Sequence, residues 1–125
     1  MQRLGNLTLL LILICAAQAE GFDNLSQTAN QIFHLSEEMV FHGSEGHVHE
    51  IVDYGEKMLI EIDKLTRDLK NLKRSNQKAL QKSIKATRDK TASAIRLGKQ
   101  GSLAASLTSA KSALSHAKKV RQELR

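Results

Sequence analysis

The chain has 125 residues and a formal net charge of +6, with no proline, no tryptophan, one tyrosine and one cysteine. Ala, Leu, Lys, Ser and Glu dominate it, which is typical of an all-helical protein. The sequence shows no nucleophile beside a partnered base and no phosphate-binding loop, so we expect a protein that is not an enzyme.

Charge divides along the chain. Residues 20–63 hold ten acidic groups and one basic group, whereas residues 64–125 hold three acidic and seventeen basic groups. Because opposite charges attract, we expect the acidic half and the basic half to pack side by side. All the histidines except His116 lie in the acidic half, where the local field attracts metal cations.

Residues 1–19 have the pattern of a signal peptide. Arg3 supplies a positive charge, an apolar run covers residues 7–14, and Ala17-Gln18-Ala19 fits a cleavage site. The apolar run is shorter than the ~20 residues that a membrane span needs. We therefore predict cleavage after residue 19 and a periplasmic or secreted protein. An uncleaved N-terminal anchor is the alternative.

Cleavage leaves residues 20–125, a length that predicts one domain. It also removes Cys15, the only cysteine in the chain. The mature chain would then contain no disulfide and no thiol, so its stability would depend on packing. A bound metal would be held by nitrogen and oxygen ligands and not by thiolate.

Apolar side chains at helical spacing predict four helices within this domain. They cover about residues 24–42, 47–73, 77–97 and 102–124. The second helix has the clearest apolar stripe and the third has the thinnest. In the fourth helix we expect the inward side chains to be Leu103, Leu107, Ala110, Leu114, Ala117 and Val120.

A glycine turn occurs twice. Gly43 and Gly46 recur 55 residues later as Gly98 and Gly101, and apolar positions coincide at the same offset. Each pair lies between two predicted helices, and glycine both ends helices and allows tight turns. The pattern indicates a duplicated helical hairpin.

The two hairpins, residues 20–75 and 76–125, predict an all-α, antiparallel four-helix bundle with both glycine turns at the same end. A single long extended hairpin or a dimer is the alternative arrangement. For the oligomeric state we expect a monomer or a weak dimer.

Histidines gather around the first turn. His42 and His47 flank it, with Glu38 one helical turn before His42 and Glu50 one turn after His47. Because residues three or four apart on a helix are neighbours, each imidazole has a carboxylate beside it. Two imidazoles with one or two carboxylates suit copper(II), nickel(II) or zinc(II). We therefore predict a divalent-metal site drawn from these four residues.

Two further histidines extend the candidate metal site. His34 lies four residues before Glu38, and His49 lies four residues before Asp53. The alternative interpretation is that histidines near helix ends are solvated or interact with the helix dipole. His116 lies about 21 Å along its helix from the second turn, so it cannot share a site with the first turn in a monomeric bundle.

The segment His42-Gly43-Ser44-Glu45-Gly46-His47 follows Glu37 and Glu38 and precedes an acidic amphipathic helix. In these features the chain resembles the small metal-binding proteins of the bacterial periplasm, which are histidine-rich, helical and exported. The resemblance implies that the chain binds copper and other divalent metals.

The second turn departs from this family pattern, because Leu97 and Ser102 stand where histidines flank the first turn. Tyr54 and Glu61 also stand where the family tends to repeat histidine, and His34 is one residue out of step. The resemblance therefore implies a histidine-poor member of the family with one remaining site.

The basic half suggests a different function. The segment Lys64–Arg96 carries far more basic than acidic groups, and a basic helical face can bind a polyanion or an anionic membrane surface. This segment has no aromatic residue that could stack on bases, so we expect no nucleic-acid binding. A purely structural bundle is the third alternative. Metal buffering or sequestration outside the cytoplasm is the function that we predict.

Overall fold

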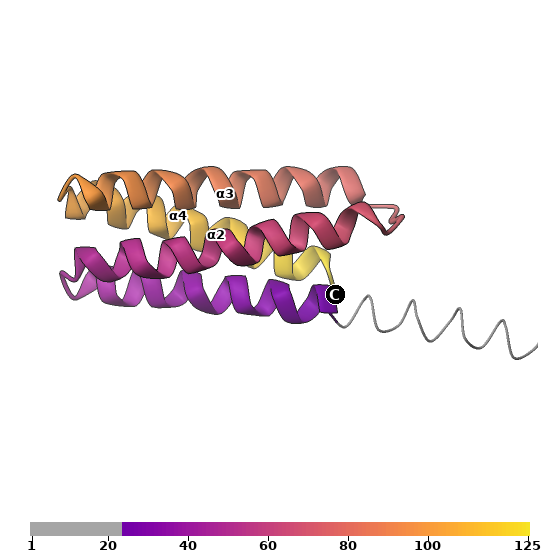
Figure 1. Cartoon of the computed structure of the whole chain (residues 1–125), viewed down its shortest axis with the longest axis horizontal. Helices are drawn as coiled ribbons and strands as arrows, with labels where there is room; N and C mark the ends of the chain where they lie inside the picture. Colours follow the sequence, from indigo (N-terminus) through magenta and orange to yellow (C-terminus); the bar gives the residue numbers. More distant parts are fainter. Residues whose placement is uncertain (1–23) are drawn as a thin grey trace, which may run out of the picture.

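Four helices run antiparallel to one another in the computed structural model, which describes residues 24–125 (Figure 1). The first helix covers residues 24–44 of the described part, followed by α2 (Val48–Lys70), α3 (Gln77–Lys99) and α4 (Leu103–Glu123). The described residues contain no strand. The predicted all-α, antiparallel four-helix bundle is confirmed, and the single extended hairpin is wrong. The predicted signal peptide lies outside the described residues.

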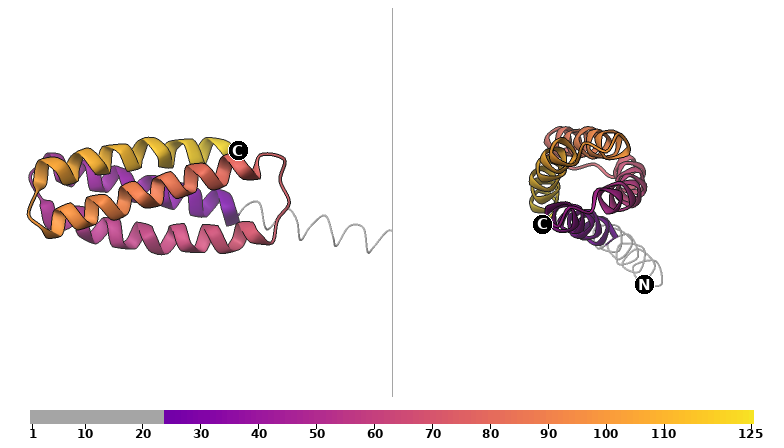
Figure 2. Two further views of the ribbon diagram at one scale, coloured as in Figure 1. Left: turned by 90° about the horizontal axis from the view of Figure 1, so that it is seen from above. Right: turned by 90° about the vertical axis from the view of Figure 1, so that its left-hand side faces the viewer.

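The four helices surround a shared apolar core (Figure 2). Helical spacing brings the apolar side chains of each helix to one face, and the largest fully buried ones include Leu25, Ile32, Met58, Leu65 and Leu80. Burying a side chain of this size contributes about 1.5–3 kcal/mol to folding. None of the helices that the structure describes combines the length and the apolar character needed to cross a membrane.

The thin apolar stripe of α3 is completed by hydroxyl side chains. Thr87 and Thr91 are fully buried. Each donates a hydrogen bond of 2.8 Å to the carbonyl oxygen four residues earlier in the helix. Because these hydroxyls are satisfied, they avoid the cost of burying an unpaired polar group. The helix can therefore enter the core with few large apolar side chains.

Small residues form the inner face of α4. Ser106 and Ala113 are fully buried, and the Ser106 hydroxyl donates a hydrogen bond of 2.7 Å to the Ala94 carbonyl of α3. Small side chains at this contact let the two helices approach closely. Ala110, Ala117 and Val120 are buried as expected, whereas the leucines of α4 lie at the edge of the core, where Leu103 and Leu107 pack against it. The half-buried ones are Leu103, Leu107 and Leu114.

The two glycine turns lie at the same end of the bundle and share one backbone conformation (Figure 1). Gly46 and Gly101 have φ angles of 91° and 76°, which glycine adopts without steric cost. In the first turn the His47 amide donates a hydrogen bond of 2.9 Å to the His42 carbonyl, and the equivalent bond 55 residues later measures 3.0 Å. The hairpin repeat is therefore present in the structure as well as in the sequence.

Two further glycines pack the hairpins against each other. A Cβ atom at Gly43 would lie 2.7 Å from Ile51 of α2 and 2.9 Å from Leu107 of α4, and one at Gly98 would lie 2.7 Å from Val52 of α2. All of these distances are shorter than Cβ atoms normally tolerate. Each hairpin thus uses a glycine to accommodate an aliphatic side chain of the other. This reciprocal contact holds the two turns next to each other.

Candidate metal centre

The first turn joins the C-terminal end of the first helix to the N-terminal end of α2. His42 lies in the last turns of the first helix, His47 immediately precedes α2, and Glu50 is the acidic residue in the first turn of α2. The positive end of the α2 dipole stabilises a carboxylate at that position. Reversal of the chain therefore brings side chains from two antiparallel helices to one place.

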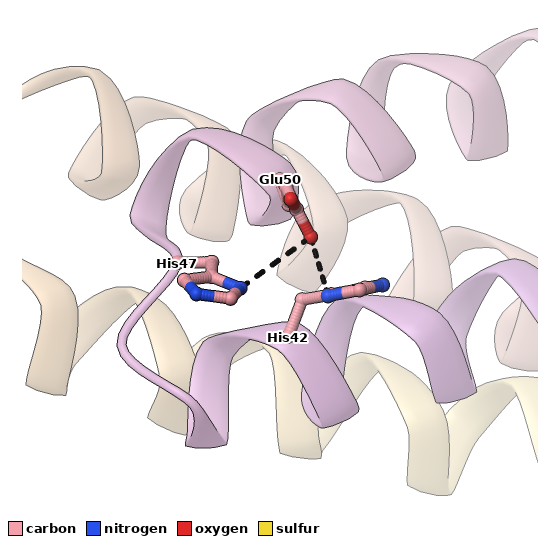
Figure 3. Close-up of side chains that lie close together, drawn as sticks. All are labelled: His42, His47 and Glu50. Carbon is pink, nitrogen blue, oxygen red and sulfur yellow. Dashed lines mark ion pairs between the residues drawn. The ribbon is translucent and has the colours of Figure 1, made fainter.

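His42, His47 and Glu50 converge on one point (Figure 3). One ligand atom from each residue lies within 4.8 Å of the other two. Glu50 Oε2 forms an ion pair with His42 Nδ1 and lies 3.7 Å from His47 Nδ1. Zinc binds such atoms at about 2.0–2.2 Å, which places tetrahedral ligand atoms roughly 3.4 Å apart. The Glu50–His47 distance is close to this spacing, whereas the ion-paired atoms of His42 and Glu50 lie closer together and would move apart to share an ion.

The site is sheltered on the side of His42. The His42 side chain is 22% exposed, whereas those of Glu50 and His47 are 42% and 54% exposed. His42 Nδ1 and Glu50 Oε2 are buried atoms, and the ion pair between them lacks good hydrogen-bond geometry. A buried imidazole nitrogen and a buried carboxylate oxygen are also donor atoms of the kind that a divalent transition metal binds.

Glu45 is a further member of the cluster, and it was absent from the site predicted from the sequence. Its Oε2 atom lies 3.6 Å from His42 Nδ1 and 3.7 Å from His47 Nδ1. Glu45 follows His42 by three residues, so the helical spacing rule contained the signal. Its place in the turn, outside either predicted helix, hid that signal. The cluster accordingly contains two imidazoles and two carboxylates.

Glu38 contacts the opposite edge of the His42 ring. Its Oε2 atom lies 3.4 Å from His42 Nε2, while Oε1 lies 3.7 Å from His34 Nε2. Glu38 is therefore placed as a partner of the far imidazole nitrogen and not beside Nδ1. His34 is one helical turn further away, and its side chain is 62% exposed. Of the residues predicted for the site, these two lie outside the convergent group.

His49 also lies outside the convergent group. It is exposed on α2, and no ion pair with Asp53 is found in the part of the chain that the structure describes. Neighbouring positions on a helix point about 100° apart, so a residue two positions after His47 faces away from it. The structure thus brings together three of the six residues predicted for the site and adds Glu45.

Aromatic rings pack around His42. Its ring is stacked on Tyr54, with centroids 5.4 Å apart and an angle of 8° between the planes. His47 is stacked on it at 5.9 Å and 28°, and Phe41 contacts it edge-on at 5.2 Å. These contacts restrict the plane of the imidazole. They involve Tyr54, a residue to which the sequence assigned no role at the site.

No protein-family model matches the chain, and no curated protein or solved structure is significantly similar to it. The resemblance to small periplasmic metal-binding proteins therefore remains a prediction from residues 42–47 and their neighbours.

Proposed function

We propose that the protein binds one divalent transition-metal ion at the first turn. The observation that carries this proposal is the convergence of His42, His47 and Glu50 from two helices, with buried donor atoms facing each other. Two imidazole nitrogens and a carboxylate oxygen are ligands for copper(II), nickel(II) and zinc(II). Glu45 is close enough to supply a fourth ligand atom.

The ligand set favours borderline cations over soft ones such as copper(I) or silver(I). Soft ions prefer thiolate and thioether sulfur. The two methionines of the described chain, Met39 and Met58, are 0% exposed and belong to the core, so their sulfur atoms do not reach the turn. Nitrogen and oxygen atoms are then the donors that an incoming ion meets.

Buffering or sequestration of metal outside the cytoplasm is the role that fits these features. His47 and Glu45 are about half exposed, so an ion can exchange with solvent without opening the bundle. The signal-peptide pattern of residues 1–19 supports an exported protein. No catalytic step is required in this role.

The basic surface supports a structural explanation better than a polyanion-binding one. Arg88 pairs with Asp63 of α2, and Lys99 pairs with Glu56 at 2.8 Å. These two pairs link the basic hairpin to the acidic one, so part of the positive charge is neutralised within the bundle. Binding of polyanions is the second candidate function, because many lysines of α3 remain exposed.

Calorimetric titration of the protein with copper(II), nickel(II) and zinc(II) tests the proposal. We expect one site per chain at neutral pH. Binding should weaken by roughly several hundred-fold between about pH 7 and about pH 5, because the reference pKa of imidazole is about 6.5 and both ligating imidazoles must be neutral to bind the ion. A titration without saturable binding, or binding that is level across this pH range, would contradict the assignment of imidazole ligands.

A further inference from the structure

The geometry points to Tyr54 and Glu38 as positioning residues that fix His42 so that its Nδ1 atom, and not the more commonly used Nε2, is the metal ligand. This inference rests on the proposed function and specifies which atom of the site does the binding. The sequence placed Glu38 among the ligands and gave Tyr54 no part.

The two nitrogen atoms of His42 face different carboxylates. Nδ1 faces Glu50 and Glu45, whose Oε2 atoms each also lie 3.7 Å from His47 Nδ1. Nε2 faces Glu38 at 3.4 Å. When a metal ion occupies Nδ1, the proton of the neutral ring must reside on Nε2, where Glu38 is the nearby acceptor. Carboxylates in this position orient a ligating imidazole and raise its basicity.

The face of the ring is held by Tyr54. The nearly parallel planes, 8° apart with centroids at 5.4 Å, correspond to a stacked aromatic pair. Tyr54 is itself partly buried and packed against the apolar core, and the Lys57 ammonium lies 5.1 Å from the centroid of its ring. Packing against the core therefore fixes the Tyr54 ring, and stacking on Tyr54 fixes the orientation of the His42 imidazole plane.

The second hairpin shows what these two positions do without a histidine between them. The equivalents of Glu38 and Tyr54, 55 residues later, are Ser93 and Ser109. Their hydroxyl oxygens lie 3.2 Å apart and bond directly across the two helices. In the first hairpin both positions carry larger side chains, and each of them contacts His42. Glu38 and Tyr54 thus contact the imidazole of His42 from two sides, whereas Ser93 and Ser109 contact each other.

Nuclear magnetic resonance of the zinc-loaded protein tests which nitrogen binds. We expect long-range nitrogen-15 spectra to show His42 with a metal-bound Nδ1 and a protonated Nε2. Zinc bound through Nε2 would overturn the inference while leaving the proposed function intact. Failure of zinc to bind at all would count against the proposed function, and the His42 resonances of the metal-free Tyr54 variants would then decide the positioning role.

Variants of the two residues test the positioning role. Tyr54→Leu should abolish the ring-current shift of the His42 protons in the metal-free protein and weaken zinc binding about three- to tenfold. Tyr54→Phe should preserve both, because it keeps the aromatic face. Glu38→Ala should weaken binding by about tenfold or more, since partners of ligating histidines contribute on this scale.

The matched control is Ile60→Ala, a change at a 66% exposed position of α2 remote from the turn. It should leave zinc affinity and the His42 resonances at their parent values. Melting by circular dichroism shows whether each variant is folded at the temperature of the titration. A Tyr54→Leu protein that is folded, loses the ring-current shift and still binds zinc as tightly as the parent would refute the role of the stack.

Discussion

The two glycine turns of this bundle have almost the same backbone and very different side chains. Both contain a glycine at positive φ, and both are closed by the same hydrogen bonds. The first turn carries His42, His47 and Glu50, whereas the second carries Leu97, Ser102 and Ala105 at the equivalent positions. The same backbone conformation thus forms with and without the histidines and the glutamate. The fold of the turn does not depend on the residues that make the first turn a candidate metal site.

Stability and function can therefore vary independently at this end of the molecule. The reciprocal contacts of Gly43 with Leu107 and of Gly98 with Val52 hold both turns in place. The side chains proposed as ligands, His42, His47 and Glu50, do not belong to the buried apolar core. Changes to ligands should alter metal binding with small effects on folding, and changes to the glycines should alter the folding of both turns alike.

The largest effect is expected from removing both imidazoles of the first turn. His42→Ala combined with His47→Ala should lower copper(II) or zinc(II) affinity at least about 100-fold, because two nitrogen ligands are lost at once. Ser102→Ala, which changes the second turn at the position equivalent to His47, and His116→Ala on α4 should each leave affinity unchanged. Titration calorimetry measures all three, and parent-like binding by the double variant would mean that the first turn is not the site.

Placing the proposed ligand residues in the second turn tests whether its backbone can also present a metal site. Leu97→His, Ser102→His and Ala105→Glu together should raise the stoichiometry from one ion per chain to two. The new site should be about 10- to 100-fold weaker than the first, because Ser93 and Ser109 cannot orient its histidines as Glu38 and Tyr54 do. Calorimetry with zinc(II) gives the stoichiometry. A folded variant that still binds one ion would show that the shared backbone is not sufficient to present the ligands.

A smaller and symmetrical effect should follow from replacing the glycines at positive φ. Gly46→Ala and Gly101→Ala should each lower the free energy of unfolding by about 1–2 kcal/mol, the cost of a left-handed conformation for a residue with a Cβ atom. No atom within 4 Å obstructs either Cβ, so strain in the backbone is the only cause. Urea unfolding measures both.

Metal binding distinguishes these two glycine variants. Zinc(II) affinity should fall in Gly46→Ala and remain at the parent value in Gly101→Ala, since only the first turn holds the ligands. Equal losses of affinity in the two variants would mean that the turns are coupled more tightly than the reciprocal glycine contacts imply.

The smallest expected effect concerns the charge of the two hairpins. Arg88–Asp63 and Lys99–Glu56 join them through exposed ion pairs, each of which contributes about 0–1 kcal/mol. Sodium chloride near 0.1 M screens charges over about 10 Å, so the metal-free protein should melt a few degrees lower than at low salt. Circular dichroism gives the melting temperature. A rise with salt would indicate a self-repelling basic face and favour the polyanion-binding candidate.

The sequence was sufficient to predict the helices and the position of the turns. Helical periodicity depends on short-range spacing, and the glycine pairs are local signals, so both can be read without a structure. The inner face of α4 was predicted only in part: Ala110, Ala117 and Val120 are buried as expected, whereas the burial of Ser106 and Ala113 was missed. Small residues give no hydrophobic signal, and their burial depends on how closely α3 approaches.

The candidate site could be predicted only in part for a related reason. His42, His47 and Glu50 follow from their spacing around the turn. The contact of Glu45 with both imidazoles depends on the path of the chain through the turn, and the stack of Tyr54 on His42 depends on the distance between two helices. Both are tertiary contacts, and His34 and His49 show that spacing alone also selects residues that the fold keeps apart.

Anomalous scattering from crystals of the protein loaded with zinc(II) tests the central claim most directly. The account predicts one strong peak per chain at the first turn, at about 2.0–2.2 Å from Nδ1 of His42 and from Nδ1 of His47, with a Glu50 oxygen at a similar distance. No peak should occur at the second turn. A peak at His34, His49 or His116 with none between His42 and His47 would contradict the account.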